Sequence, residues 1–426
     1  MKKLLIIPAF LLISFLNSST IIYTSSYIDV NNGKIVNDSS IVINEKKITK
    51  ISAGYINIGQ DDILIDLRGF TVMPGLMDMH VHFGGEYQSK AERPIKVERE
   101  TEAILATAHA ATTLKSGFTT VRQVGDSGFV SISLRDAIEA GHVIGPRIFS
   151  SGKSIATTGG HADPTNGKSI DEYDFPSPEQ GVINGPYEAY AAVRQRYKDG
   201  ADGIKLTVTG GVLSVAKSGD NPQFTEEEVS AVVNAAKDYG MWVAVHAHGA
   251  EGMKRAVIAG VDSVEHGTFM TEEVMDLMIQ KGTYYVPTIS AGEFVAEKAK
   301  IDNFFPEIVR PKAATVGPQI GSTFGKAYKR GVKIAFGTDV GVQAHGTNWK
   351  EFVYMVKYGM DPMSTIQSAT VETAKLLSEF DNIGSISVGK IADIIAVSGN
   401  PIENINNMEN VVFVMKDGEV FFNETD

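Results

Sequence analysis

The 426-residue chain contains no cysteine. This absence excludes disulfide bonds, thiolate metal ligands and a cysteine nucleophile, so a metal site here must use imidazole, carboxylate or water ligands. Basic residues are also scarce, because 39 Lys and Arg stand against 51 Asp and Glu and give a formal net charge of -12. A broad nucleic-acid surface needs clustered Lys and Arg, so we expect no nucleic-acid partner.

The N-terminus has the layout of a secretory leader. Lys2 and Lys3 precede an apolar run over residues 4–16, and small polar residues follow it. This order is typical of a signal peptide, and the run is too short for a comfortable membrane span. A buried first strand is the alternative, but residues 21–30 supply a better one. We predict that residues 1–18 are a signal peptide and that the chain is exported, periplasmic or secreted, without a stable membrane anchor.

The two ends of the remaining chain share a sequence pattern typical of short β-strands. Short apolar runs such as Ile21–Val30 and Val411–Lys416 are separated by Asn, Gly and Pro, and helical periodicity is missing. Such runs between turn residues predict strands. We therefore predict a small β-sandwich domain built from both termini, residues 19–73 and 385–426.

The middle of the chain, residues 74–384, alternates strand-like with helix-like segments, which predicts a parallel α/β domain. Thr225, followed by three glutamates, is typical of a helix N-cap. No glycine-rich phosphate motif opens the first strand-to-helix turn, which argues against dinucleotide binding. Eight candidate strands favour a (β/α)8 TIM barrel over an open sheet. They lie near residues 75–82, 119–124, 147–151, 203–208, 242–248, 262–266, 283–288 and 333–338.

Polar residues recur at the ends of these strands, where barrel enzymes place their catalytic groups. Histidines two residues apart on a strand point the same way and can reach one metal. Any one of these residues could be structural, but five of the nine histidines at predicted strand ends favour a metal site. The strand-end residues are His80, His82, His246, His248, His266 and Asp339.

Lys205 lies within an otherwise apolar predicted strand, Gly203–Val208. A buried ammonium is costly unless it is paired or neutralised. Two explanations stay open from the residues alone. Lys205 either pairs with a barrel carboxylate or is carbamylated by carbon dioxide, which would convert it into a carboxylate that can bridge two cations.

These positions together resemble the amidohydrolase superfamily over nearly the whole chain after the leader. The string TVMPGLMDMHVH is similar to the family's first-strand signature, and GSISVGKIADI is similar to its C-terminal segment. The strings TTGGHADP, TGGVLS, HAHGAEG and SVEHGTFM resemble the Xaa-Pro dipeptidase (prolidase)-like branch, which is related to imidazolonepropionase-like proteins.

The resemblance implies a (β/α)8 hydrolase with two divalent metal ions bridged by carbamylated (N6-carboxy) Lys205 and a hydroxide. Zinc suits such a ligand set, although manganese, iron or cobalt could occupy it. Asp339 is implied as the general base that passes the water proton to the leaving nitrogen. One ion is expected to take His80, His82 and Asp339, and the other His246 and His266.

Substrate contacts are expected on the loops that follow the strands. His161 is predicted to be both a catalytic residue and a substrate-binding residue, since it could contact the carbonyl or a carboxylate. His248, Arg122 and His345 are predicted to bind substrate. A cation-rich mouth of this kind fits a free C-terminal carboxylate. The alternative for each residue is a hydrogen bond that merely orders a loop.

The leading prediction for function is a dipeptidase that removes proline or a similar C-terminal residue. The main alternative is an amidase for N-acyl or aryl-acyl amino acids, including ochratoxin-type amides. A cyclic-amide hydrolase or a deaminase is less favoured; the latter would use His248 and Glu251, but Lys205 opposes it. A non-catalytic scaffold would be expected to lose ligands, and all six are present. We also expect a homo-oligomer.

Overall fold

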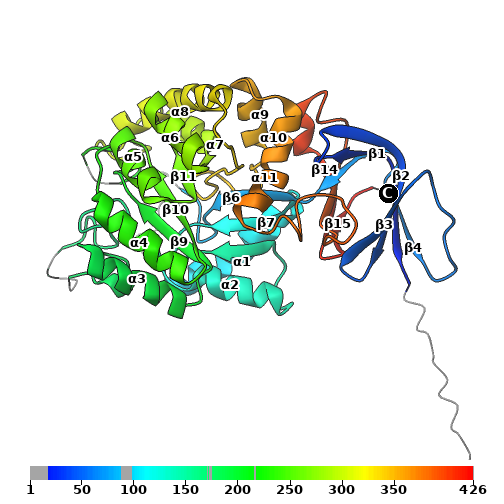
Figure 1. Cartoon of the computed structure of the whole chain (residues 1–426), viewed down its shortest axis with the longest axis horizontal. Coiled ribbons are helices and arrows are strands. Elements are labelled where there is room, and N and C mark those ends of the chain that lie inside the picture. The colour runs from blue at the N-terminus through cyan, green and yellow to red at the C-terminus, as the bar shows by residue number, and fades with distance from the viewer. Residues whose placement is uncertain (1–17, 88–97, 170, 172–174, 215–216, 426) are drawn as a thin grey trace, which may run out of the picture.

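The computed structural model describes residues 18–87, 98–169, 171, 175–214 and 217–425. It has two lobes, a helix-covered α/β barrel and a β-sheet lobe beside it (Figure 1). The predicted signal peptide lies outside the described residues except for Ser18. Among the described helices, none has both the length and the apolar character needed to cross a membrane. The homo-oligomer and the export of the chain stay predictions.

Parallel strands, most of them fully buried, form the wall of the barrel, as expected for strands covered on both faces. They pair in the orders β6-β7-β8 and β12-β11-β10-β9. Ile155 joins the two groups, because its amide donates to the Lys205 carbonyl at 2.8 Å and its carbonyl accepts from Thr207 at 3.1 Å. The strands are β6 (Leu76–Val81), β7 (Phe118–Gln123), β8 (Arg147–Ser150), β9 (Gly203–Thr207), β10 (Trp242–Ala247), β11 (Ser263–His266) and β12 (Tyr284–Val286).

Residues 333–340 close the barrel between β12 and β6 but do not form a regular strand. Their carbonyls accept hydrogen bonds from the amide of Tyr285 at 2.8 Å on one side and of Met79 at 2.9 Å on the other. A Cβ atom at Gly337 would lie 2.3 Å from a neighbouring side chain, so this segment needs glycine to pack so closely. The regular strand predicted for residues 333–338 is therefore wrong, although the closure of the barrel is correct.

Helices surround the strands, as Figure 1 shows. Helix α4 begins at the predicted N-cap Thr225, whose side chain accepts from the amide of Glu228 in a capping box. The helices are α1 (Arg99–Lys115), α2 (Val130–Glu139), α3 (Pro186–Lys198), α4 (Glu226–Asp238), α5 (Ala250–Ala259), α6 (Glu272–Lys281), α7 (Ile289–Lys298), α8 (Arg310–Arg330), α9 (Lys350–Lys357), α10 (Pro362–Ser368) and α11 (Val371–Leu376), with short 3-10 helices at Pro178–Gln180 and Ile405–Glu409.

Strands from both ends of the described chain build the second lobe. They form one sheet in the order β15-β14-β13-β5-β1-β2-β3, with β4 paired to β1. A bridge from Lys47 in β3 to Ile391 ahead of β13 shows that the sheet folds over on itself around a shared apolar core. The strands are β1 (Thr20–Asp29), β2 (Lys34–Asn44), β3 (Lys47–Ala53), β4 (Ile63–Asp66), β5 (Thr71–Pro74), β13 (Ile394–Val397), β14 (Val411–Lys416) and β15 (Glu419–Asn423).

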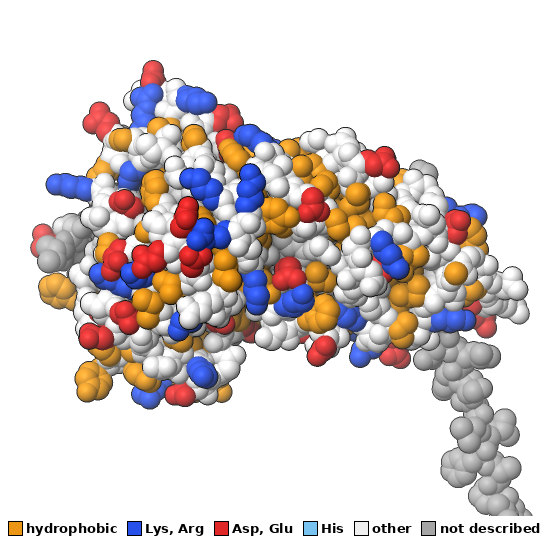
Figure 2. All heavy atoms as spheres, turned by 45° about the horizontal axis from the view of Figure 1, so that its top comes forward, with side chains coloured by type: hydrophobic (Ala, Val, Ile, Leu, Met, Phe, Trp, Pro, Cys, Tyr) orange, Lys and Arg blue, Asp and Glu red, His pale blue; other side chains and the backbone are white. Residues whose placement is uncertain are grey.

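Charged side chains of both signs are mixed on the face shown in Figure 2. Some of the exposed charged residues form ion pairs with one another. Arg330 pairs with Asp276 at 2.6 Å and with Glu272 at 3.1 Å, and Lys254 pairs with Glu273 at 2.6 Å. Exposed pairs of this kind contribute little to stability, so the barrel depends mainly on its apolar core.

Candidate metal centre

The polar ends of the barrel strands converge on one cavity of about 890 Å³. This volume lies in the range typical of small-molecule sites. All six predicted metal ligands line the cavity, together with His161 and His248. They are His80, His82, Lys205, His246, His266 and Asp339.

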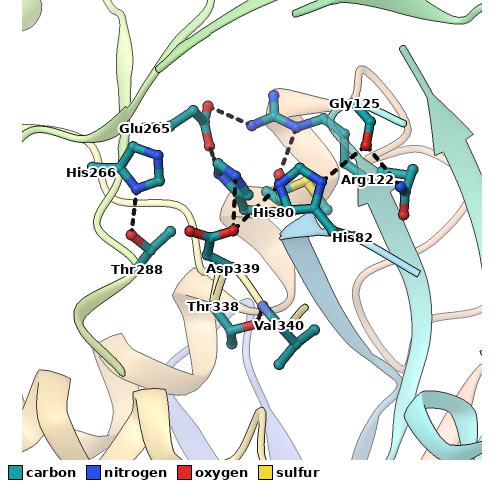
Figure 3. A network of polar contacts seen from close by, with 12 residues as sticks. His80, His82, Arg122, Gly125, Glu265, His266, Thr288, Thr338, Asp339 and Val340 are labelled. Atoms are coloured by element: carbon teal, nitrogen blue, oxygen red, sulfur yellow. Dashed lines mark hydrogen bonds and ion pairs between the residues drawn. The ribbon is translucent and has the colours of Figure 1, made fainter. Parts of the chain in front are cut away.

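His80, His82 and Asp339 form the first part of the site (Figure 3). Oδ1 of Asp339 lies 3.5 Å from Nε2 of His80 and 3.3 Å from Nε2 of His82. The amide of Asp339 donates to the His80 carbonyl at 2.8 Å, which ties the closing segment to the end of β6. Nδ1 of His82 is held by the Gly125 carbonyl at 3.0 Å. Both imidazoles therefore direct Nε2 toward one carboxylate oxygen.

Glu265 contacts the nitrogen of the His80 ring that is not directed toward Asp339. Its Oε2 lies 2.8 Å from Nδ1 of His80, and its Oε1 accepts from Arg122 at 2.8 Å (Figure 3). Burial would raise the pKa of Glu265, but Arg122 and His80 outweigh it and lower the pKa to about 2. An ionised carboxylate on the second nitrogen of a ligand histidine fixes its tautomer and strengthens it as a ligand.

The same contacts change the role predicted for Arg122. Its Nε donates to the Met79 carbonyl at 2.8 Å and its Nη1 to Ser263 at 3.0 Å. The side chain is fully buried and is not among the described residues that line the cavity. These three hydrogen bonds fix Arg122 in the barrel wall beside Glu265, which favours a structural role for it, and substrate binding by Arg122 stays a prediction.

His246 and His266 form the second part of the site. Their ring centroids lie 4.6 Å apart, and the His80 ring lies 5.0 Å from that of His266. Nδ1 of His266 is bonded to Thr288 at 2.8 Å, and Nε2 of His246 is bonded to the Gly210 carbonyl at 3.0 Å. Each ring is thus oriented by one nitrogen and leaves the other for a ligand.

Burial keeps these imidazoles neutral. It lowers the pKa of His80 to about 4, with Lys205 adding to the effect. Burial also lowers the pKa values of His246 and His266, and neighbouring histidines lower them further. A neutral imidazole is the form that binds a metal.

Lys205 lies between the two parts on β9 and is only 3% exposed. Its Nζ makes no hydrogen bond or ion pair with any residue in the described part of the chain. Burial lowers the pKa of Lys205 to about 8, although Glu265 and Asp339 act in the opposite direction. The lowered pKa increases the neutral fraction of Lys205 near neutral pH, and the neutral amine is the form that can react with carbon dioxide.

Backbone strain gathers at the site. Asp339, His266 and Thr288 have φ values of 60°, 69° and 52°, in the left-handed region that residues other than glycine seldom adopt. Each of these residues lies at or within two residues of the end of a barrel strand or of the closing segment, and each lines the cavity. Strained residues of this kind are typical of functional sites.

His161 and His248 line the cavity, whereas His345 does not. The His161 ring stacks on His246 with centroids 4.3 Å apart, and its Nδ1 has no hydrogen-bond partner among the described residues. His248 Nδ1 is bonded to Thr268 at 2.8 Å. His345 instead stacks on His109 at 4.2 Å, behind the cavity wall. The loop after residue 339 folds the His345 ring against His109, which favours a structural role for it, and substrate contact by His345 stays a prediction.

Glu251, the second residue of the His-x-x-Glu pattern, lies on α5 and pairs with Arg255 at 2.8 Å. Its side chain is 55% exposed and is not among the described residues that line the cavity. It therefore cannot move protons beside His248 in this structure, which disfavours the deaminase alternative.

The sequence argument missed several charged residues of the cavity, among them Lys153 and Arg99. Lys153 follows β8 by three residues, so its place after a barrel strand was a usable signal. It makes no ion pair or hydrogen bond with any described residue. Burial, followed by repulsion from Arg196 and Arg99, lowers the pKa of Lys153.

The residues fit divalent cations. His80, His266 and Asp339 each offer a ligand atom, and these atoms lie within 4.8 Å of one another. In both histidines Nδ1 is hydrogen-bonded to the protein, which leaves the lone pair on Nε2 for a metal. The predicted division of the ligands gave His80 and Asp339 to one ion and His266 to the other. In the structure His266 lies close to both His80 and Asp339, so it could serve either ion.

The chain is similar to several known proteins over most of its length. The model of the family described as "Amidohydrolase family" matches residues 71–421. A crystal structure of a Xaa-Pro dipeptidase with bound methionine in the active site is 72% identical, with a TM-score of 0.94, and covers 95% of this chain and 100% of that one. Ochratoxinase of Aspergillus niger is 29% identical over 94% of this chain and 86% of its own length. Imidazolonepropionase of a Geobacillus species is 23% identical over 93% of this chain and 91% of its own.

Proposed function

Because the chain belongs to the amidohydrolase family, we propose that it is a metal-dependent dipeptidase that releases proline or a similar C-terminal residue. The observation that carries this proposal is the convergence of six ligand-type side chains on one cavity, whose wall also carries Lys153, a cation that pairs with no described residue. The similarity to a Xaa-Pro dipeptidase at 72% identity supports it.

The residues that would hold two divalent ions, with zinc as the expected metal, are His80, His82, His246, His266, Asp339 and a carbamylated Lys205. Such ions polarise an amide carbonyl and lower the pKa of an attacking water. Asp339, whose Oδ1 lies between His80 and His82, takes the proton and delivers it to the departing nitrogen. His161, with a free ring nitrogen above His246, is placed to bind the carbonyl oxygen or the substrate carboxylate.

The rest of the cavity suits a small peptide with an apolar side chain. One wall is apolar and consists of Val212, Leu213, Ala291, Val295, Val316, Ile320 and Val342. In the related Xaa-Pro dipeptidase the bound molecule is methionine, which has an apolar, unbranched side chain. We propose that this apolar wall receives the apolar side chain of the substrate. The positive charge of Lys153 would bind the substrate carboxylate.

A hydrolysis screen tests the proposal. Metal-loaded enzyme is incubated with Xaa-Pro and other dipeptides, N-acyl amino acids and cyclic amides, and the products are measured by mass spectrometry. Release of the C-terminal residue from Xaa-Pro dipeptides is the expected result. If no dipeptide is cleaved, the proposal is wrong.

The second candidate function is an amidase for aryl-acyl amino acids, including ochratoxin-type amides. The size of the cavity, about 890 Å³, together with its apolar wall favours this candidate, since an aryl group would fit there. The similarity to ochratoxinase also supports it. In the same screen, faster cleavage of N-aryl-acyl amino acids than of dipeptides would replace the leading candidate with this one.

Replacing Lys153 tests how the substrate carboxylate is bound. Methionine at this position keeps the length of the side chain but removes its charge. We expect Lys153→Met to lower kcat/KM for dipeptides by about 10-fold to 100-fold, mainly through KM, because a hydrogen bond to a charged group is worth roughly 1.5–3 kcal/mol. Steady-state kinetics measure both parameters.

Two controls isolate the charge of Lys153. The same dipeptides with a C-terminal amide lack the carboxylate, so the variant should cleave them nearly as well as the wild type does. Lys198→Met, on the exposed end of α3, should leave the kinetics unchanged. An equal loss for acids and amides would show that Lys153 does not bind the carboxylate.

A further inference from the structure

A second cluster of ligand-type side chains lies behind the cavity wall. Glu86, His109 and His345 each offer a ligand atom, and these atoms lie within 4.8 Å of one another. None of the three is among the described residues that line the cavity, and none belongs to the proposed catalytic set. The cluster is therefore separate from the catalytic centre.

His345 is the residue that the fold leaves unsatisfied. Its side chain is 8% exposed, and neither Nδ1 nor Nε2 makes a hydrogen bond of good geometry with a described residue, although the backbone of Gly85 and of His82 lies beside the ring. A neutral imidazole carries one donor and one acceptor, and leaving both unpaired in the interior costs free energy. Burial, then repulsion from His109, lowers the pKa of His345 to about 3, although the backbone of Gly85 and His82 acts in the opposite direction, so the ring is neutral at neutral pH.

His109 is prepared to act as a ligand. Its Nδ1 lies 2.8 Å from the Phe83 carbonyl and must donate to it, which leaves the lone pair on Nε2. That nitrogen lies 4.0 Å from Oε1 of Glu86. A backbone carbonyl on the far nitrogen is the usual partner of a histidine that binds a metal. The ring stacks on His345 with an interplanar angle of 17°.

Glu86 supplies the negative charge and links two loops. Its Oε1 accepts from the amide of His345 at 2.8 Å, so the carboxylate lies beside both rings. Its side chain is 37% exposed, which gives a cation access from solvent. Glu86 follows the strand end that carries His82, and His345 follows Asp339.

We propose that Glu86, His109 and His345 form a third divalent-cation site, which binds zinc or a similar ion of intermediate softness. Two imidazoles and one carboxylate, with a position left for water, are a ligand set that zinc accepts. A cation there would satisfy His345 and tie the loop after β6 to the loop after residue 339. On binding zinc, the three ligand atoms must move closer together than they lie now, because Zn–N and Zn–O bonds measure about 2.0–2.2 Å.

Metal counting tests this site. Metal-free wild type, Glu86→Gln and His109→Gln are equilibrated with low-micromolar free zinc and bicarbonate, and bound zinc is measured by mass spectrometry. We expect each variant to bind about one equivalent less than the wild type. Glu86→Gln keeps an oxygen to accept from the His345 amide, so it should fold even if the other variant does not. Zinc should also raise the Tm of the wild type more than that of either variant.

The difference between wild type and variant is the decisive quantity, because it does not depend on whether the catalytic centre fills. His142→Gln is the matched control, since this histidine is exposed and should leave the zinc content unchanged. If Glu86→Gln and His109→Gln bind as much zinc as the wild type, the third site does not exist. A wild type that binds one equivalent, lost in both variants, would support the third site and contradict the catalytic one.

Discussion

Lys205→Ala is expected to lose a metal ion and to lower kcat/KM for dipeptides by at least about 10³-fold, which corresponds to about 4 kcal/mol of transition-state stabilisation. As an ammonium, Lys205 would cancel the charge of Asp339 and leave the ligands without net negative charge to hold two cations. A carbamate reverses that charge. Zinc content and steady-state kinetics of the purified variant measure both effects.

Two further measurements separate a carbamate from a plain buried cation. Metal-free enzyme prepared without carbon dioxide should regain activity with zinc only when bicarbonate is added. Lys205→Arg keeps a positive charge but cannot form the carbamate, so it should be as inactive as the alanine variant. An arginine variant with near wild-type activity, or an alanine variant that keeps both ions and its activity, would contradict the proposed centre.

The ligands at the strand ends could be predicted because the hydrophobic pattern locates the strands. Side chains alternate between the two faces of a strand, so the position of a residue in the strand predicts the face on which it lies. His80 and His82 are two apart on β6, and His246 and His266 end neighbouring strands β10 and β11. In a parallel barrel those ends meet at one face. The sequence was therefore sufficient to bring the ligand-type residues to one cavity, whereas the roles of Lys205 and Asp339 were implied by the family resemblance.

Long-range register explains what the sequence could not predict. His80 and Glu265 are 185 residues apart, and their contact depends on how the barrel closes. Arg122 shares that network, so its role could not be known before the pairing of β7 with β6 was seen. The loop after residue 339 has no periodicity, and only the structure shows that it turns His345 away from the cavity. Lys153 was missed because the argument followed histidines rather than cations.

Replacing Asp339 tests the proton transfer. Asparagine keeps the size of the side chain and tolerates the left-handed backbone at φ 60°, so the fold should be preserved. Asp339→Asn should lower kcat for dipeptides by about 10²-fold to 10⁴-fold, the usual contribution of a general acid–base group, with a smaller change in KM. The pKa of Asp339 is lowered, because His80, His82 and Lys205 outweigh the effect of burial, so the wild-type carboxylate is ionised and ready to accept a proton.

The leaving group distinguishes proton transfer from metal binding. An aminoacyl p-aminobenzoate departs as a weakly basic aryl amine that needs little protonation, so Asp339→Asn should lose less activity toward it than toward Xaa-Pro. Asp238→Asn is the matched control, because this carboxylate is exposed at the end of α4 and is not among the described residues that line the cavity. An equal loss on both substrates, with zinc content reduced, would mean that Asp339 serves only as a ligand. His161 would then be the remaining candidate to protonate the leaving nitrogen, since its ring already lies over His246 in the same cavity.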